Sequence, residues 1–389
     1  MQYFPRLADR KQLAATCIAL FASITAFADG PAVVAKVDHS LWHQPVNTVA
    51  GFDKASRASI LTYVLVLKEM QKQSDAQMLA SFKIKSINRA SVEKWLKKEN
   101  ALSLANYRFA MRDCTEQDWT CIGDVRGVED LQQKATKAVA KTPEDLRAWQ
   151  ENLKRFASTY VAEQLRLAAL FPKITSEIDV FNDQEWTGDN IPDKHFFLSF
   201  DDGPTAASGS TDDTLSMLSG QKKTAVFFML GENLSGRSSH SNAAALKALY
   251  KNQCVASHGW QHQSHAKWDQ WQDSIHRTQT LLKTIFGNEQ VSPYFRPPYG
   301  QRKADSGAFF KAEGLQVALW NIDSQDWNNN VSIGDVGNRM ITLMLIKRHG
   351  MLLFHDIHPK AKVALPVMFE SFGNAVTWGD CKQLAVNLK

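Results

Sequence analysis

The chain has few cysteines, little net charge and only one long apolar stretch, and each shortage excludes a class of protein. Its 389 residues include five cysteines, and none has the C-x-x-C spacing of a cysteine-based metal site. The formal charge of +5 is too small to favour nucleic acid as a partner. No second apolar stretch approaches the roughly 20 residues of a membrane span, so none is predicted beyond the N-terminus.

The one long apolar stretch, LAATCIALFASITAFA, follows the basic residues Arg6, Arg10 and Lys11. It ends at the small-x-small sequence Ala26-Phe27-Ala28, which is typical of a cleavage site. We therefore predict that residues 1–28 are a secretory signal peptide and that the protein is exported, to the periplasm or beyond the cell. The alternative, an uncleaved membrane anchor, requires a longer run of about 20 residues. Cleavage lowers the formal charge from +5 to +3, which would suit an anionic cell-envelope partner only weakly.

Four cysteines remain after residue 28: Cys114, Cys121, Cys254 and Cys381. An even number in an exported chain favours disulfides. Cys114 and Cys121 are the natural local pair, which leaves Cys254 to pair with Cys381.

Residues 29–185 are predicted to form an all-α domain. Apolar residues recur at spacings of three and four in the runs ASILTYVLVLKEMQKQ, SVEKWLKKENALSLANYRFAMR and TPEDLRAWQENLKRFASTYVAEQLRLAALF. Thr142-Pro143-Glu144-Asp145 is typical of a helix start, with a capping threonine and a proline at the first position. No motif with chemistry lies in this region, and its residues do not assign it a role.

Residues 190–389 are predicted to form an α/β domain, introduced by the linker-like sequence GDNIPDK. The strand-like runs HFFLSF, TAVFFML, PYFR, QVALWNI and GMLLF alternate with the helical runs NAAALKALYKN, QDSIHRTQTLLKTIF and ADSGAFFKAEG. This alternation indicates right-handed crossover units and a parallel sheet or barrel.

A polar cluster follows each predicted strand of this half. Asp201 and Asp202 come after FLSF, and the sequences SHGWQHQSH, RPPYG, DSQDW and HDIHP follow the later strands. In a barrel of parallel strands, the loops at the C-terminal ends of the strands meet at one mouth. The clusters are therefore expected to form a single site.

His258 and His262 are candidate metal ligands. Residues four apart can lie on one face of a helical turn and present two imidazoles to one ion. One added carboxylate gives three protein ligands and an open position, which suits a catalytic zinc site. His265 is a rival ligand, and a surface or core role for all these histidines is the alternative interpretation.

The adjacent acids Asp201 and Asp202 are interpreted as a base beside a metal ligand. Consecutive residues just beyond a strand point in different directions, so one can bind the ion while the other stays free. A free carboxylate there can take a proton from water activated by the ion. The alternative is a polar turn, because Asp, Gly and Pro are ordinary turn residues.

The ordered motifs LSFDDGP, SHGWQH, RPPYG, DSQDW and LFHD resemble the signature motifs of the NodB-type polysaccharide deacetylases, carbohydrate esterase family 4. The resemblance runs from about Lys194 to the C-terminus, roughly half of the chain. It implies a distorted (β/α)7 barrel, preceded here by the all-α domain.

The resemblance also implies a role for each matching residue. Asp201 corresponds to the catalytic base and Arg296 to the arginine that orients it. His355 corresponds to the general acid and Asp326 to its partner. Tyr299 corresponds to the residue whose backbone N–H helps to hold the oxyanion. The remaining matches are the metal ligands Asp202, His258 and His262, and Trp327 and Leu353, which line the acetyl pocket and groove.

The implied reaction is metal-dependent removal of acetyl groups from an N-acetylated amino-sugar polymer such as peptidoglycan or a chitin-like chain. Zn²⁺ is the expected ion, with Co²⁺ or Ni²⁺ as alternatives. The competing functions are hydrolysis of O-acetyl esters on a polysaccharide and glycan binding without catalysis. The helical domain would then position glycan, dock onto an envelope protein, or support the barrel.

Gly259 follows the first metal histidine, where the family usually has Ser or Thr, so a local hydroxyl hydrogen bond is expected to be missing. His358, three residues after His355, is a competitor for the role of acid. Several tryptophans in this half are expected to pack in the core or on the surface rather than to bind sugar: Trp260, Trp268, Trp271 and Trp320.

Overall fold

The structure, a computed structural model, describes residues 31, 33–115 and 118–384. The predicted signal peptide lies outside the described residues. Ala32–Lys389 forms one compact unit. Among the helices described in this unit, none combines the length and the apolarity needed to cross a membrane.

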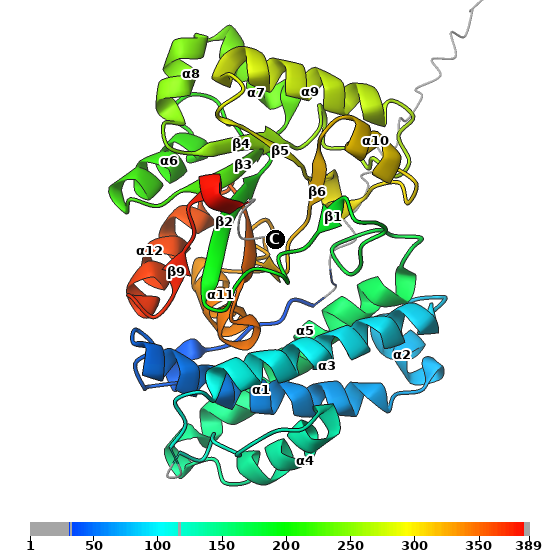
Figure 1. The fold of residues 1–389 in the computed structure, drawn as a ribbon, viewed down its shortest axis with the longest axis vertical. Helices are drawn as coiled ribbons and strands as arrows, with labels where there is room; N and C mark the ends of the chain where they lie inside the picture. Colours follow the sequence, from blue (N-terminus) through cyan, green and yellow to red (C-terminus); the bar gives the residue numbers. More distant parts are fainter. Residues whose placement is uncertain (1–30, 32, 116–117, 385–389) are drawn as a thin grey trace, which may run out of the picture. The chain divides into compact units, whose positions relative to one another are not determined.

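The first half of this unit is helical, as predicted (Figure 1). The three predicted runs form α1, α3 and α5, while α2 and α4 were not singled out from the sequence. A helical segment does start here, at Glu144, but Thr142 does not cap it, because the Thr142 hydroxyl donates to the carbonyl of Val139 at the end of the preceding helix. The elements are η1 (His39–Leu41), α1 (Val49–Gln71), α2 (Asp75–Phe82), α3 (Arg89–Ala110), α4 (Val128–Val139), η2 (Glu144–Leu146) and α5 (Arg147–Leu170).

The second half is a sheet of parallel strands with helices, which confirms the predicted distorted barrel. Its strand order is β1-β6-β5-β4-β3-β2-β8-β7, and β9 pairs with β2. The strands are β1 (Glu185–Trp186), β2 (His195–Asp201), β3 (Ala225–Met229), β4 (Cys254–Ser257), β5 (Val291–Phe295), β6 (Gln316–Ala318), β7 (Ile322–Asp323), β8 (Gly350–His355) and β9 (Thr377–Trp378). The helices are α6 (Ser210–Gly220), α7 (Gly231–Ser239), α8 (Ala243–Leu249), α9 (Trp271–Phe286), α10 (Gly307–Ala312), α11 (Ile333–Lys347) and α12 (Lys360–Phe372), with η3 (Pro298–Gly300) and η4 (Cys381–Gln383).

Alternation along β2 separates the two faces of the sheet. Phe196, Leu198 and Phe200 belong to a core cluster that includes residues of α11 and α12, whereas Phe197 belongs to a second cluster. Because side chains alternate with a period of two, Ser199 and Asp201 share the face of Phe197. The apolar run that forms the strand therefore also aims its last carboxylate away from the helix-covered face.

The predicted strand QVALWNI is two strands: β6 lies next to the edge strand β1, and β7 is the opposite edge of the sheet. The chain crosses between them at Leu319, Trp320 and Asn321. The carbonyls of Ala318 and Leu319 accept hydrogen bonds from the guanidinium of Arg296. Where the chain leaves β6, this side chain therefore takes the place of a neighbouring strand as hydrogen-bond donor. Asn321 links the two edges, since its amide donates to Asp189 and its oxygen accepts from the N–H of Met351.

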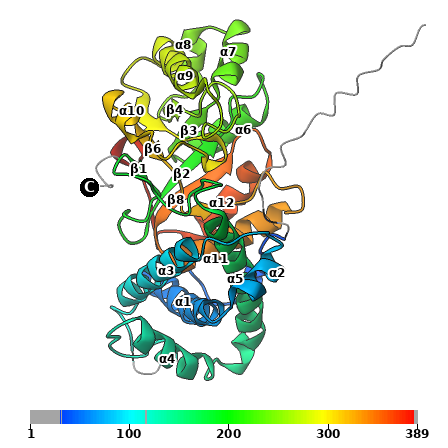
Figure 2. The same cartoon turned by 90° about the vertical axis from the view of Figure 1, so that its right-hand side faces the viewer.

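The helical half covers the opening between these two sheet edges. A small polar cavity there is lined by residues of α3 and α5 on one side and by Thr187, Asp189, Trp320, Asn321 and Asp323 on the other. Figures 1 and 2 show α11 next to α1 and α3. Buried ion pairs join the halves: Glu99 with Lys347 at 2.5 Å, Glu163 with Arg339 at 2.8 Å and Asp53 with Arg348 at 2.7 Å. The division into two domains stays a prediction.

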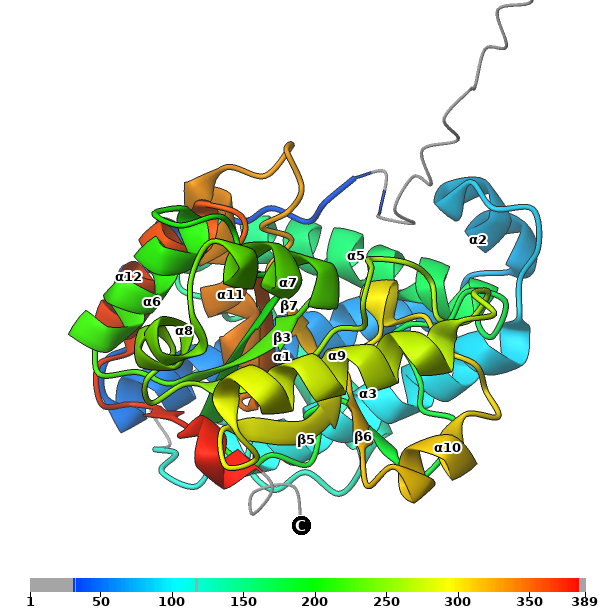
Figure 3. The same cartoon turned by 90° about the horizontal axis from the view of Figure 1, so that it is seen from above.

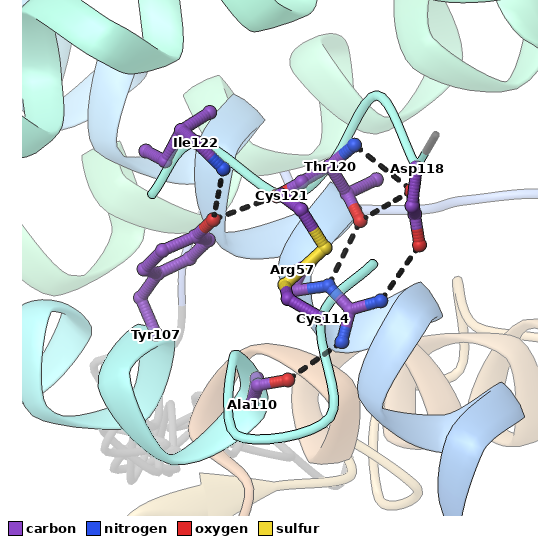
Figure 4. Close-up of a disulfide and its surroundings, with 8 residues drawn as sticks. All are labelled: Arg57, Tyr107, Ala110, Cys114, Asp118, Thr120, Cys121 and Ile122. Atoms are coloured by element: carbon purple, nitrogen blue, oxygen red, sulfur yellow. Dashed lines mark hydrogen bonds and ion pairs between the residues drawn. A yellow bond between two sulfur atoms is a disulfide. The ribbon is translucent and has the colours of Figure 1, made fainter. Parts of the chain in front are cut away.

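Both predicted disulfides are present. Cys254–Cys381 joins β4 to η4 near the end of the described chain, and Cys114–Cys121 closes a loop after α3. Figure 4 shows Arg57 of α1 beneath that loop, donating to the carbonyl of Ala110, the hydroxyl of Thr120 and the carboxylate of Asp118. The loop is therefore fixed to α1 by a buried guanidinium as well as by the covalent bond.

Asp53→Ala tests whether the helical half and the barrel unfold together. The substitution removes the partner that Lys194 and Arg348 share on α1, and breaking a buried pair typically costs about 3–5 kcal/mol. We expect the free energy of unfolding to fall by about 3 kcal/mol. Circular dichroism and tryptophan fluorescence should both report the same single urea transition. Glu69→Ala on the same helix removes an exposed pair with Lys154 and should cost less than about 1 kcal/mol. Two separate transitions would contradict a shared core.

Candidate active site

The adjacent acids lie where β2 ends, in different backbone conformations. Asp201 is the last residue of β2 and is in register with His355 of β8. Asp202 has a φ of 77°, in the left-handed region that non-glycine residues rarely adopt. This turn sends the two carboxylates in different directions, and strain of this kind concentrates at functional sites.

Asp202, His258 and His262 form a group that can hold one metal ion. Asp202 Oδ1 is 3.3 Å from His258 Nε2 and 3.4 Å from His262 Nε2, and the three ligand atoms lie within 4.8 Å of one another. Within the described part of the chain, this buried Oδ1 has no hydrogen-bond partner. A buried carboxylate oxygen without a partner among the described residues, facing two ring nitrogens, is the donor set that a cation site requires.

The tautomer of His258 fits the same interpretation. Its Nδ1 is 2.6 Å from the carbonyl oxygen of Arg296, which can only accept, so Nδ1 carries the proton. Nε2 therefore presents its lone pair towards Asp202. Metal-binding histidines usually donate their second ring nitrogen to such a carbonyl or carboxylate.

The protonation states also suit a ligand set. Burial lowers the pKa of His262 to about 4, so its ring is neutral near pH 7. Burial acts to raise the pKa of Asp202, but the neighbouring imidazoles, with the protonated His355 among them, outweigh it and hold that pKa well below its usual range. A neutral imidazole and an ionised carboxylate are the forms that bind metal.

Asp201 is held by one oxygen and free at the other. Arg296 Nη1 donates to Asp201 Oδ1 at 2.8 Å and to Ser199 Oγ at 2.8 Å. Asp201 Oδ2 lies 3.8 Å from His258 Nε2, on the side of the ligand group. Arg296 is itself fully buried, with its guanidinium carbon 4.0 Å from the centre of the Phe228 ring.

His355 and Asp326 form a tight pair at the end of β8. His355 Nδ1 is 2.7 Å from Asp326 Oδ1, and the backbone N–H of His355 donates to Asp326 Oδ2 at 2.9 Å. Burial opposes the charge on the ring, but Asp326 and the other nearby carboxylates raise the pKa of His355 to about 10. The ring is therefore a proton donor at neutral pH.

The rival histidines differ from these in their surroundings. Burial lowers the pKa of His358, the direction opposite to that required of an acid. The buried His265 uses both ring nitrogens, with Nδ1 2.9 Å from the carbonyl of Gln263 and Nε2 3.1 Å from Ser274 Oγ. His265 is outside the group of possible ligands.

The other predicted site residues lie beside this group or beneath it. Tyr299 has a φ of 60°, and its ring centre is 4.3 Å from that of His262. Trp327 is half-buried in the loop after β7, next to Asp326. Leu353 is buried in β8, two residues before His355 and in the same cluster as Phe197 and Phe228.

Sequence reasoning missed residues that hold the loop at Asp202. Asp356 accepts from the N–H of Gly203 at 3.0 Å and from the hydroxyl of Thr211 at 2.7 Å. A Cβ at Gly203 would come within 2.2 Å of Asp356 Oδ2, so only glycine fits. Asn233 donates to the carbonyl of Asp202 at 2.7 Å. Asp356 was in the quoted LFHD motif, whereas no local pattern points to Asn233.

Comparison with known proteins connects this site to one family. Residues 188–318 match the family model for polysaccharide deacetylase. Chitin deacetylase 3 of Cryptococcus neoformans var. neoformans is 31% identical over 215 residues, which are 48% of this chain and 50% of that protein. The peptidoglycan-N-acetylglucosamine deacetylase of Bacillus cereus is 28% identical over 196 residues, 45% of this chain and 64% of that protein. The bifunctional xylanase/xylan deacetylase of Cellvibrio japonicus is 28% identical over 157 residues, 39% of this chain and 22% of that protein.

A solved structure shows a similar extent of likeness. The family 4 carbohydrate esterase from Streptomyces lividans in complex with acetate is 28% identical, with a TM-score of 0.41 over 48% of this chain and 92% of that one. The chain thus spans half or less of the length of the chitin deacetylase and of the xylanase/xylan deacetylase. The ordered motifs and the family-model match over residues 188–318 agree, which confirms the resemblance of this part of the chain to the NodB-type polysaccharide deacetylases, carbohydrate esterase family 4.

Proposed function

We propose that this protein is an exported, metal-dependent polysaccharide N-deacetylase that hydrolyses the acetamido groups of an N-acetylated amino-sugar polymer. Peptidoglycan or a chitin-like chain is the expected substrate, and acetate and a free amine are the products. The observation that carries the proposal is that Asp201, a carboxylate, and His355, an imidazole, lie in register on adjacent strands beside a candidate ligand group. Glycan binding alone requires neither proton donor nor base.

Asp202, His258 and His262 would hold the ion, with Zn²⁺ expected and Co²⁺ or Ni²⁺ as alternatives. When bound, the ion supplies a Lewis acid for the acetyl carbonyl and lowers the pKa of water at the site. The residues around it orient the substrate and move protons.

Asp201 is the proposed base. Its Oδ1 is fixed by Arg296, so Oδ2 stays available to take a proton from the attacking water. His355 is the proposed acid, which gives its proton to the leaving nitrogen while Asp326 keeps the ring oriented. The backbone N–H of Tyr299 is proposed to stabilise the oxyanion. Trp327 and Leu353 are proposed to line the acetyl pocket and groove.

A second candidate activity is O-deacetylation, favoured by the match to a protein named as a xylan deacetylase. Without a proton donor the nitrogen would have to leave as an amide anion, a much poorer leaving group than an alkoxide, so loss of His355 should harm an amide substrate more than an ester. The protein should be incubated separately with chitin oligomers, peptidoglycan and acetylated xylan, and the products analysed by mass spectrometry. Acetate from the first two supports N-deacetylation, acetate from xylan alone supports the ester alternative, and none from any substrate contradicts both.

Removing the metal should abolish activity reversibly. After dialysis against a chelator we expect acetate release to stop, and addition of Zn²⁺ to restore it, because no other group at the site replaces a Lewis acid. His262→Ala should remain inactive after Zn²⁺ is added. Full activity of the chelated protein, with metal absent by mass spectrometry, would contradict metal dependence.

Asp201→Asn should separate the base from the ligand set. The amide keeps an oxygen for Arg296 but cannot take a proton, so we expect kcat to fall about 10²–10⁴-fold. Zn²⁺ affinity, measured by calorimetry, should stay within a few-fold of the wild type. Asp213→Asn, at an exposed ion pair on α6, is the matched control and should leave kcat unchanged. A large loss of Zn²⁺ affinity in Asp201→Asn would show that Asp201 is a ligand.

The alkaline limb of the rate profile should depend on Asp326. Its carboxylate raises the pKa of His355, so replacing it with asparagine removes that support and lowers the pKa of the ring. We expect the alkaline limb of kcat in Asp326→Asn to move to lower pH by at least about one unit. A bound cation repels the imidazolium and so lowers the pKa of His355, and the wild-type limb should therefore lie below about 10. An unchanged limb in Asp326→Asn would exclude His355 as the acid.

A further inference from the structure

Gly259, between the candidate ligands, has no room for a side chain. Its φ is +83°, and a Cβ there would lie 2.6 Å from Cε1 and 2.7 Å from Nε2 of His265, and 3.0 Å from Ser274 Oγ. The imidazole of His265 therefore occupies the space in which a side chain at residue 259 would lie.

His265 sits in a hydrogen-bond chain with one possible direction. The carbonyl of Gln263 can only accept, so His265 Nδ1 carries the proton and Nε2 is the acceptor. Ser274 Oγ lies 3.1 Å from Nε2 and accepts from the N–H of Trp260 at 2.7 Å. The hydroxyl proton of Ser274 therefore points to His265 Nε2. Each polar group in this series of hydrogen bonds thus has a partner.

This chain of bonds ties the ligand loop to α9. Ser274 is in the first turn of α9, and both Ser274 and His265 are 1% exposed. Trp260, which donates to Ser274, lies between the ligands His258 and His262 in the sequence. The hydrogen bonds thus run from the backbone inside the ligand loop, through two side chains, back to the backbone at Gln263.

The opposite side of the loop is held by α7. The carbonyls of Gly259 and Trp260 accept from the N–H groups of Gly231 and Glu232, each at 2.9 Å. The guanidinium of Arg277 lies 3.9 Å from the centre of the Trp260 ring. Figure 3 shows α7 and α9 close together, as their contacts require. With α7 bonded to the carbonyls and α9 bonded to an N–H, the loop is fixed from both helices.

We propose that His265 and Ser274 are positioning residues for the metal site: they fix the loop that carries His258 and His262 from the side of α9. The inference rests on the proposed function, because it assumes that these two histidines bind an ion. It assigns to His265 a role beside the ligands, with Nδ1 bonded to the loop at Gln263 and Nε2 bonded to Ser274 of α9.

The first test measures Zn²⁺ affinity of the metal-free protein by calorimetry. In His265→Ala and in Ser274→Ala we expect the affinity to fall about 10–100-fold, as for other residues that orient metal ligands. Ser274→Thr keeps the hydroxyl and should stay within about threefold of the wild type. Co²⁺ absorption in the visible range should change in the two alanine variants and not in Ser274→Thr.

His349→Ala is the matched control for loss of a buried histidine. His349 is 7% exposed and bonds to the carbonyl of Asp189, away from the ligand loop. We expect it to lower the thermal unfolding midpoint without changing Zn²⁺ affinity. If His265→Ala and Ser274→Ala also lower only the midpoint, the proposed role is wrong and the two residues are simply core.

A double-mutant cycle tests whether the His265 ring occupies the space that a side chain at residue 259 would need. Gly259→Ala alone should weaken Zn²⁺ binding, because the new methyl group displaces the His265 ring. In the His265→Ala background the same substitution should cost less, since the ring is absent, and the two effects are then non-additive. Strict additivity would contradict the inference. Failure of the wild type to bind Zn²⁺ would instead overturn the proposed function, and this inference with it.

Discussion

The buried guanidinium of Arg296 and its own backbone connect the parts of the site that must stay in register. Its Nη1 holds Asp201, while its carbonyl accepts from His258 Nδ1 and fixes the ring that faces Asp202. Its remaining donors take the carbonyls of Ala318 and Leu319, where the chain leaves β6 and crosses to β7. One residue therefore sets the orientation of the proposed base, the tautomer of a proposed ligand and the break between the sheet edges. The guanidinium also donates to Ser199, and a lysine, with three donors, could not serve all of these acceptors.

The groups of the site differ in direction and in protonation state. The carboxylates of Asp201 and Asp202 leave the same strand in different directions, so only Asp202 faces both imidazoles. Asp326 raises the pKa of His355 to about 10, while burial lowers the pKa of His262 to about 4. Histidines at the same mouth thereby have opposite protonation states, as a proposed proton donor and a proposed ligand require. The helical half contributes indirectly, because α3 and α5 line the cavity between the sheet edges and buried ion pairs join them to α11.

Patterns local in sequence were predictable, and contacts set by the tertiary structure were not. Alternating strand and helical runs predicted the barrel, and polar residues after each strand predicted which clusters meet. The disulfides followed from an even cysteine count. The run QVALWNI is predicted as one strand from its hydrophobicity alone. That pattern does not reveal that the distant Arg296 donates to carbonyls in the middle of the run. The hydrogen bonds of Asn233 and Ser274 join segments that are distant in sequence, as do the contacts by which the helical half covers the opening between the sheet edges. No local pattern predicts them. The hydroxyl expected to be missing at Gly259 is supplied from a distance, since Ser274 Oγ reaches the loop backbone.

X-ray absorption on the zinc-loaded protein tests the central claim most directly, because it counts and identifies the ligands without relying on turnover. The account predicts two imidazole nitrogens and a carboxylate oxygen from the protein at about 2.0–2.2 Å, with the remaining positions filled by water. The same spectrum is expected from Asp201→Asn, since that carboxylate is held by Arg296 instead of by the ion. A site with one imidazole or with three, or a spectrum that changes when Asp201 becomes asparagine, would contradict the division between ligand and base.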